Sequence, residues 1–352
     1  MNAADAMMAG RLGPESLAAV AVGGSVWLMT FTLALGVLMA ISPITARYFG
    51  AGRPEMIGRY TRQGIYIAVA FGAFVATVAQ FFAEPLLVAV QIDSGFRDLT
   101  VGYIGAIAWG APGMYTFLAL RFTTEGIGKT KPIMYTSILA LTCNIFLNYV
   151  FMFGHFGVPA MGAVGCGYAS AVTMWIIMVA LASHVLVASP YKPLKIFARL
   201  APPRPEVLRE IVVLGIPIAI TITAEVGLFA AVSILVGTRG AEITAAHQVA
   251  INFASMMFMV PLAMSSAITI QAGQLLGAGR PDRARYSAGL GIVLCAMFMS
   301  FSAIMMLLFR DVVVGLYTDN ATVKGIAISL LLMAAAFQVA DGVQIGAAGA
   351  LR

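Results

Sequence analysis

Long runs of apolar residues, separated by short polar segments, extend along the whole chain. A helix needs about 20 apolar residues to cross a bilayer, and most of these runs reach that length. Strands are disfavoured because lipid admits only helices or closed barrels, and these runs are too continuous for barrel strands. Residues 1–9 look like the end of a further helix. The pattern predicts spanning helices over 17–46, 64–90, 101–120, 132–154, 161–188, 211–236, 243–276, 286–309 and 325–351.

The composition supports the same interpretation. Of the 352 residues, 61% are hydrophobic and 10% are charged, whereas a soluble domain carries about 25% charged residues. So few charges cannot cover a surface that faces water, which excludes an ordinary soluble enzyme, a nucleic-acid binder and a disordered tail. The sequence therefore predicts an all-α polytopic membrane protein.

Lys and Arg residues divide unequally between the two sides of the predicted membrane. With residues 1–9 counted as the end of helix 1, the loops after even-numbered helices hold 16 of these residues and the opposite loops hold 5. Basic residues gather in cytoplasmic loops, so this distribution assigns the even-to-odd loops to the cytoplasm and accounts for the net charge of +6. The longest polar connection, 189–210, is predicted to be a cytoplasmic linker between helix bundles at 1–188 and 211–352.

An internal repeat relates the two bundles. Gly50-Ala51-Gly52-Arg53-Pro54 recurs as Gly277-Ala278-Gly279-Arg280-Pro281 at an offset of 227, and 17 of the 55 positions in 10–64 are identical to those in 237–291. A repeat of six helices, an even number, gives both halves the same orientation. The repeat thus predicts two six-helix bundles related by a pseudo-two-fold axis along the membrane normal, with a binding site between them.

Comparison of the two halves of the repeat predicts the length of the complete protein. Each half should contain six helices, but helix 1 is truncated in the first half and the last two helices are missing from the second. We expect about ten of twelve helices in this sequence. We therefore expect the sequence to be a fragment of a twelve-helix protein, or the product of an erroneous gene model.

Three carboxylic acids lie inside apolar segments: Asp5, Glu225 and Asp341. A charge at the middle of a bilayer costs at least about 2.5–3.5 kcal/mol on insertion scales, so each acid needs a reason to be there. One reason is a structural polar contact between helices. The other is ion-coupled transport, because a buried carboxyl group takes up a proton or a cation.

Further polar residues in the apolar segments, some near these acids and some on other helices, are candidates for the lining of a cavity. Interhelical hydrogen bonding is the alternative role for the amides, and a single histidine in such a helix is more often structural. The candidates are Asn144, Asn148, Thr221, His247, Asn252, Gln338 and Gln344.

Phosphate-binding and catalytic motifs are incomplete. Gly126-Ile127-Gly128-Lys129-Thr130 ends like a P-loop, but Thr123 stands where that motif needs its first glycine. No nucleophile–histidine–acid set and no metal-ligand spacing is evident. We therefore expect no enzyme activity, no cofactor and no bound metal beyond a coupling ion.

Several segments of the chain form a recognisable set of motifs. They are Asp5 to Gly10, the two Gly-Ala-Gly-Arg-Pro turns, Asn144 to Tyr149 with Phe153-Gly154, Ala224 to Val226, Ala246 to Phe253, Asp341 to Gln344, and Ala347 to Arg352. In combination these segments resemble the multidrug and toxic compound extrusion (MATE) transporters, in particular their NorM-like bacterial branch. The resemblance covers essentially the whole chain.

The resemblance implies a twelve-helix protein with a V-shaped central cavity and alternating access. It implies multidrug efflux in the cell inner membrane: antiport of cationic or amphipathic organic compounds against protons or sodium ions. The expected partners are small organic cations and membrane lipid, without nucleic acid, and the expected form is a monomer.

The resemblance also assigns roles. It implies that Asp5 is a cation or proton site in the N-terminal half, within a polar cluster that includes Asn144 and Asn148. It implies cation coupling by Glu225 and Asp341, with sodium near this pair as one option. Related proteins often carry a tyrosine one turn before the helix 10 aspartate, where this chain has Phe337. Because phenylalanine supplies no oxygen ligand, we expect protons, slightly in preference to sodium, to be the coupling ion.

Two other interpretations compete. A flippase for a lipid-linked precursor, from the same wider superfamily, would need basic residues in its cavity for a pyrophosphate head group, whereas the embedded charges here are acidic. A receptor or a membrane enzyme is the other interpretation, and the twofold repeat and the lack of a nucleophile or metal-ligand set argue against it.

Overall fold

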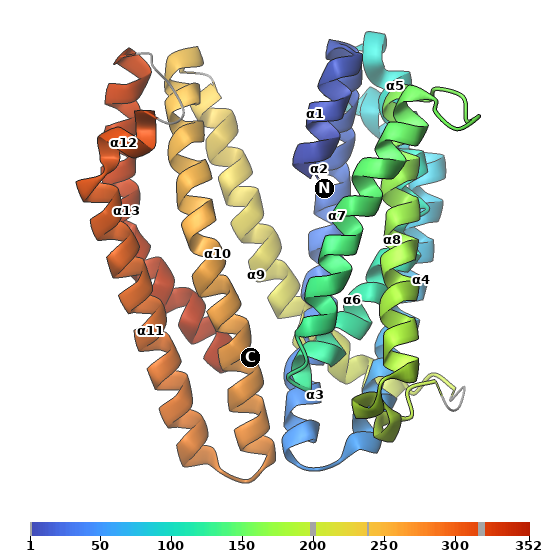
Figure 1. Cartoon of the computed structure of the whole chain (residues 1–352), viewed down its shortest axis with the longest axis vertical. Coiled ribbons are helices and arrows are strands. Elements are labelled where there is room, and N and C mark those ends of the chain that lie inside the picture. Colours follow the sequence, from blue (N-terminus) through green and yellow to red (C-terminus); the bar gives the residue numbers. More distant parts are fainter. Residues whose placement is uncertain (1, 198–201, 238, 316–320) are drawn as a thin grey trace. The chain divides into compact units, whose positions relative to one another are not determined.

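The computed structural model describes residues 2–197, 202–237, 239–315 and 321–352, and every regular element within these ranges is helical (Figure 1). Among the described residues, eight helical segments are long and apolar enough to cross a membrane. Helices satisfy their own backbone hydrogen bonds, as a lipid environment requires. The predicted all-α polytopic membrane class is therefore confirmed.

The helices form two compact units, and the domain limits predicted from the sequence stay a prediction. The first unit comprises Met1–Thr45 and Arg53–Thr223, and the second comprises Ala46–Gly52 and Ala224–Arg352. Two helices, α3 (Ile41–Gly50) and α9 (Pro205–Gly237), contribute residues to both units. The other elements of the first unit are α1 (Asn2–Leu12), α2 (Pro14–Met39), α4 (Pro54–Ala89), α5 (Ser94–Ala108), α6 (Ala111–Gly126), α7 (Lys131–Phe153), α8 (Gly162–Val187) and the 3₁₀-helix η1 (Ser189–Leu194).

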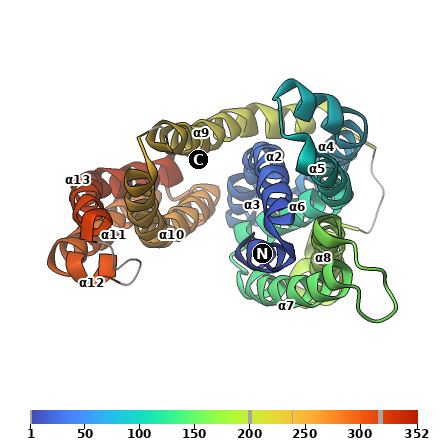
Figure 2. The same cartoon turned by 90° about the horizontal axis from the view of Figure 1, so that it is seen from above.

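In the first unit, α8 contacts α5, α6 and α7, while α4 contacts α5 and α6 (Figure 2). Its interior contains Tyr103, Ile107, Met152, Cys166 and Met174, all buried. Small residues allow the close approach of α8: a Cβ on Gly165 would meet the backbone of Phe151 in α7. Small side chains at crossings are what helix packing in membranes relies on, because lipid tails are as apolar as leucine.

The second unit contains the remaining helices. Among them α10 contacts α11 and α13, and α11 contacts α13. Buried residues of this unit include Ala246, Met306, Val314, Ala327 and Leu331. The helices are α10 (Ala241–Gly277), α11 (Pro281–Leu308), α12 (Arg310–Gly315) and α13 (Ala321–Leu351).

Two predicted spans are each interrupted in the structure. The span over 17–46 is divided at Ala40, between α2 and α3, and the span over 101–120 is divided between α5, which ends at Ala108, and α6, which begins at Ala111. Pro112 lies in the first turn of α6 and has no N–H group to continue the hydrogen bonds of α5. A Cβ on Gly110 would meet Ala171 and Met174 of α8, so the break also lets the chain pass close to α8.

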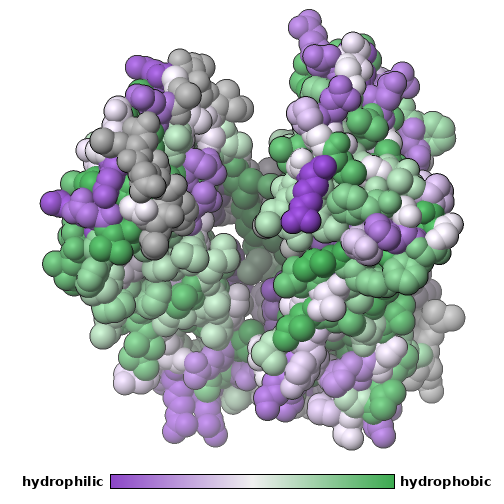
Figure 3. All heavy atoms as spheres, turned by 45° about the horizontal axis from the view of Figure 1, so that its top comes forward, coloured by the Kyte–Doolittle hydropathy of each residue, from purple (hydrophilic) through white to green (hydrophobic). Residues whose placement is uncertain are grey.

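Apolar side chains cover the lateral surface of both units. Exposed large hydrophobic residues include Phe74, Phe81 and Phe82 of α4, and Met297 and Phe301 of α11. In the space-filling view, hydrophobic residues predominate over the middle of the visible surface and hydrophilic residues gather toward its upper and lower ends (Figure 3). This distribution is typical of a protein solvated by lipid.

The two Gly-Ala-Gly-Arg-Pro turns have the same backbone geometry. Gly52 has a φ of 65° and Gly279 a φ of 71°, a left-handed conformation that glycine adopts at little cost. Arg53 and Arg280 follow with φ of −111° and −117°. In each turn the proline then opens the next helix, α4 or α11. The sequence repeat is therefore also a structural repeat.

Side-chain packing repeats at the same offset. A Cβ placed on Gly64 of α4 would overlap the side chain of Ile41, and one placed on Gly291 of α11 would overlap that of Ile268. Because these pairs are related by the offset of 227, each half packs its second repeated helix on the first in the same way.

The two turns also meet each other. A Cβ on Gly50 would overlap the carbonyl group of Gln274, and one on Gly277 would overlap the carbonyl group of Arg47. The offset of 227 converts one contact into the other, so the contact is reciprocal, as across a two-fold axis. Both turns therefore lie at the same membrane face, as the repeat predicts; the axis relating the whole bundles stays a prediction.

Gly277→Ala should loosen this contact. The added methyl group meets a backbone carbonyl that cannot rotate away, and overpacking of this kind costs about 1–3 kcal/mol. We expect a lower midpoint of thermal unfolding in detergent, and the same loss for Gly50→Ala.

Gly289→Ala is the matched control, because nothing lies within 4 Å of a Cβ at this position in α11. It should leave the midpoint unchanged or raise it. Equal midpoints for Gly277→Ala and Gly289→Ala would contradict the contact.

Candidate functional site

A cavity of about 280 Å³ lies in the second unit, among α9, α10 and α13. Glu225 of α9, His247 of α10 and Asp341 of α13 all line it. The structure therefore brings together three residues that the sequence singled out on separate helices. The rest of the wall is mostly apolar and includes Phe229, Phe258, Met333 and Phe337.

The two acids of this cavity are close enough for their charges to interact, and Glu225 also interacts with Arg352. Both carboxyl groups are only partly buried, so a ligand has access to them. Two carboxylates that share a site repel each other, and a proton or a cation between them removes that repulsion. The arrangement can therefore take up positive charge.

His247 adds a neutral or cationic group to the same wall. Its Nε2 atom is buried and forms no hydrogen bond with any described residue. Buried polar atoms normally have a partner, so an unpaired nitrogen on a cavity wall is a position where a ligand or a water can bind.

A second polar cluster lies in the first unit. Asn148 donates a hydrogen bond from Nδ2 to Oδ1 of Asp5 at 2.6 Å, and Asn144 donates to Oγ of Ser170 at 3.3 Å. The side chains of Asn144 and Asn148 are fully buried, and Asp5 is 5% exposed. The spacing of four residues places both amides on one face of α7, where α1 and α8 pack.

Three members of this cluster were not predicted. Ser170 binds Asn144, while Tyr103 and Cys166 interact electrostatically with Asp5. Ser170 and Cys166 lie in the small-residue segment of α8. The small residues around Cys166 and Ser170 predict that another helix packs closely on α8, but the sequence does not show which helix it is.

The glutamines near Asp341 face elsewhere. Gln338 is buried and donates from Nε2 to Oγ of Ser302 in α11 at 3.2 Å. Gln344 is exposed and does not line the cavity. Side chains three residues away from Asp341 lie on either side of it, so of these three polar residues of α13 only Asp341 lines the cavity. A role for either glutamine stays a prediction.

Thr221 and Asn252 also lie outside the cavity. The hydroxyl group of Thr221 donates to the carbonyl oxygen of Pro217 at 2.9 Å, within α9. Asn252 is exposed on α10. Neither contacts the acids as a ligand, and their proposed part in the site stays a prediction.

A larger cavity, of about 600 Å³, lies in the first unit among α2, α4 and α5. Aromatic side chains such as Trp27, Phe71 and Phe82 line it, and none of its lining residues is charged. It therefore suits an apolar group but offers no site for an ion.

Asn148→Leu should destabilise the fold, because it leaves the buried Asp5 without its hydrogen-bond donor. Loss of a partner for a buried polar group costs about 1–3 kcal/mol, whereas replacing both partners is much less costly. Thermal unfolding of Asn148→Leu, Asp5→Leu and the double variant measures this coupling. We expect the double variant to be more stable than the sum of the single changes implies, and strict additivity would contradict the contact.

Comparisons with known proteins place this chain in a family. The model of the MatE family matches residues 1–150 and 217–352. A eukaryotic MATE transporter, AtDTX14, has the same fold, with 20% identity and a TM-score of 0.84 over 99% of this chain and 78% of that one. An outward-facing multidrug resistance MATE transporter of the MOP superfamily gives 23% identity and a TM-score of 0.82, covering 99% and 80%.

A MOP superfamily transporter from Pyrococcus furiosus gives 22% identity and a TM-score of 0.79, again covering 99% and 80%. At these identities the likeness establishes the fold. The family match covers most of the chain and includes Asp5, Glu225 and Asp341. The chain therefore belongs to the MatE family, whose members are multi-pass membrane transporters rather than enzymes.

Proposed function

We propose that the protein is a secondary active multidrug exporter of the cell inner membrane. It moves cationic or amphipathic organic compounds by antiport with protons or sodium ions. The observation that carries this proposal is the placement of Glu225 and Asp341 in one cavity, within otherwise apolar helices. Acids in a membrane interior are expensive to keep and mark ion pathways.

The composition of this cavity supports a cationic substrate or coupling ion. Its acids attract positive charge, and its aromatic rings, among them Phe229 and Phe258, offer faces to a cation. Met333 provides a flexible apolar side chain, which suits ligands of varied shape. Together these groups fit compounds with a charged centre and an apolar body.

The Asp5 cluster is proposed as a second proton or cation site, in the first unit. Asp5 receives one strong hydrogen bond from Asn148 and has acceptor positions left for a proton or an ion. The amide oxygen of Asn148 has no hydrogen-bond partner among the described residues and offers a further neutral ligand. A carboxylate beside neutral oxygens can bind either coupling ion.

A flippase for a lipid-linked precursor is the alternative. A pyrophosphate head group would require Lys or Arg in the cavity wall. The described lining of the second-unit cavity contains neither and holds two acids instead. This difference favours the drug exporter.

Protons are the slightly favoured coupling ion. Phe337 lies one turn before Asp341 and lines the same cavity, so an aromatic ring stands where a hydroxyl group would complete a sodium site. A proton needs only a carboxyl group, whereas sodium prefers several oxygen ligands. Sodium binding by Glu225 and Asp341 together remains the competing assignment.

Glu225→Gln should abolish gradient-driven efflux, because the substitution keeps the size of the side chain and removes its charge. Purified protein in proteoliposomes, loaded with a fluorescent organic cation, gives the measurement under an imposed pH or sodium gradient. Glu242→Gln is the control, since Glu242 is exposed on α10 outside the cavity. Wild-type efflux by Glu225→Gln would overturn the proposal, provided both variants insert equally.

Phe337→Tyr should increase the dependence of efflux on sodium, because it adds an oxygen one turn from Asp341. In the unmodified protein, a pH gradient without sodium should drive most of the efflux. Phe301→Tyr makes the same change on α11 outside the cavity and should have no effect. Efflux driven mainly by sodium in the unmodified protein would contradict the proton assignment.

A further inference from the structure

A third cavity, of about 490 Å³, lies in the first unit, where the loop before α7 faces the end of α8 and the start of η1. The incomplete P-loop-like segment, Gly126 to Thr130, supplies part of its wall through Gly128, Lys129 and Thr130. His184 of α8 and Tyr191 of η1 form the opposite side. The transport sites proposed above do not use this cavity.

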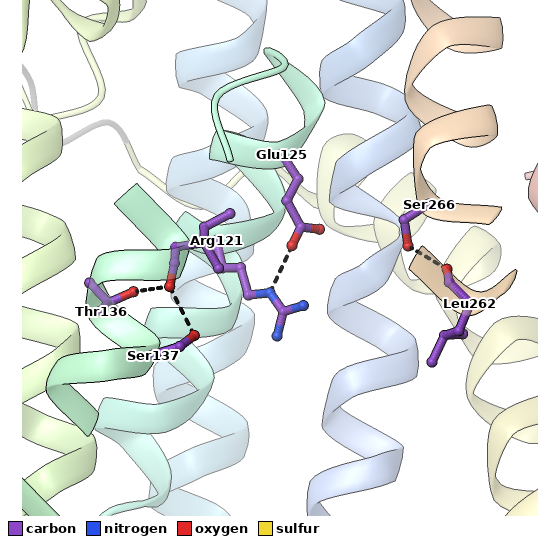
Figure 4. Close-up of polar contacts among 7 residues, drawn as sticks. Arg121, Glu125, Thr136, Ser137, Leu262 and Ser266 are labelled. Atoms are coloured by element: carbon purple, nitrogen blue, oxygen red, sulfur yellow. Dashed lines mark hydrogen bonds and ion pairs between the residues drawn. The ribbon is translucent and has the colours of Figure 1, made fainter. Parts of the chain in front are cut away.

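Its ionisable lining is basic. Lys129 and Lys131 line the cavity together with His184, and no acidic residue does. Both lysines are exposed, and neither forms an ion pair within the described part of the chain. The nearby Arg121 differs, because it is neutralised by Glu125 at 2.8 Å (Figure 4). Unneutralised positive charge is thus concentrated in the cavity.

The backbone adds donors to this charge. The cavity wall includes Thr130 and Lys131 at the start of α7, where no side chain caps the helix. The N–H groups of these two residues form no hydrogen bond in the described structure. Free N–H groups at a helix N-terminus attract anions, and here they lie beside two ammonium groups.

Aromatic residues pack together in the wall of this cavity, and they add no negative charge to it. His184 meets Tyr191 edge-to-face, with 5.8 Å between ring centroids. Burial raises the pKa of the Tyr191 phenol, with a smaller opposing effect from Thr124, so the phenol stays neutral. Tyr135, also in the wall, is 63% exposed, as expected of an aromatic residue at a membrane boundary.

The position of the cavity points to the source of its ligand. The predicted orientation places this loop on the cytoplasmic side, at the ends of two membrane-spanning helices. Basic pockets between such helices bind the head groups of anionic lipids. We infer that this cavity binds a phosphate group, supplied by an anionic phospholipid of the cytoplasmic leaflet and held by Lys129, Lys131 and the N-terminus of α7.

The test uses the intact protein, purified in detergent and mixed with phosphatidylglycerol or phosphatidylcholine, with bound lipid counted by native mass spectrometry. The unmodified protein should retain phosphatidylglycerol in preference to phosphatidylcholine. The double variant Lys129→Gln/Lys131→Gln should bind phosphatidylglycerol about tenfold or more weakly, because each lysine near such a head group contributes about 1 kcal/mol.

Lys192→Gln is the matched control. Lys192 is an exposed lysine of η1, near the cavity in sequence but not part of its lining. It should leave phosphatidylglycerol binding unchanged. An equal loss in Lys192→Gln and in the double variant would reduce the effect to general surface charge and overturn the site, as would equal retention by all forms.

Inorganic phosphate distinguishes the two sources of the ligand. Stabilisation of the lipid-free protein by millimolar phosphate, lost in the double variant and without a preference for phosphatidylglycerol, would support a site for free phosphate. Lipid retention without such stabilisation supports the head-group site. Both variants should unfold at the temperature of the unmodified protein when lipid and phosphate are absent.

Discussion

Close approach of helix backbones is the constraint on which the rest of this structure depends. Lipid offers no hydrophobic force that would hold one apolar helix against another, so contact must come from packing at short distance. Glycine provides it at several helix crossings: a Cβ on Gly165 of α8, Gly72 of α4 or Gly349 of α13 would strike the backbone of a neighbouring helix. The polar clusters are held by these crossings, since α8 brings Ser170 to Asn144 only because its small residues admit α7.

The polar sites of the two units differ in composition. In the second unit an acid from each of two helices meets a histidine from a third, inside walls that are otherwise apolar. In the first unit a single acid is held by an amide, deep within the helices. The first arrangement leaves two partly buried carboxyl groups accessible to a ligand, whereas the second nearly closes around its carboxylate. The two halves thus share their framework and differ in their chemistry.

The sequence was sufficient for the class, the repeat and the acids, because long apolar runs and charges inside them are local signals. Glu225, His247 and Asp341 could be singled out separately, but their meeting in one cavity depends on how α9, α10 and α13 cross, which no local pattern encodes. The break near Gly110 was missed because the apolar run continues through it. Spacing along α13 likewise places Gln338 near Asp341, but it cannot show that Gln338 donates a hydrogen bond to Ser302 of α11.

The reciprocal contact between the two Gly-Ala-Gly-Arg-Pro turns has a consequence for how the halves diverge. Each glycine meets the carbonyl oxygen of its partner, and the partner residues are Arg47 in one half and Gln274 in the other. A contact made through main-chain oxygen places no demand on the side chain that bears it. The side chains at these two positions can therefore differ while the contact keeps its shape, so residue identity understates how closely the two turns match.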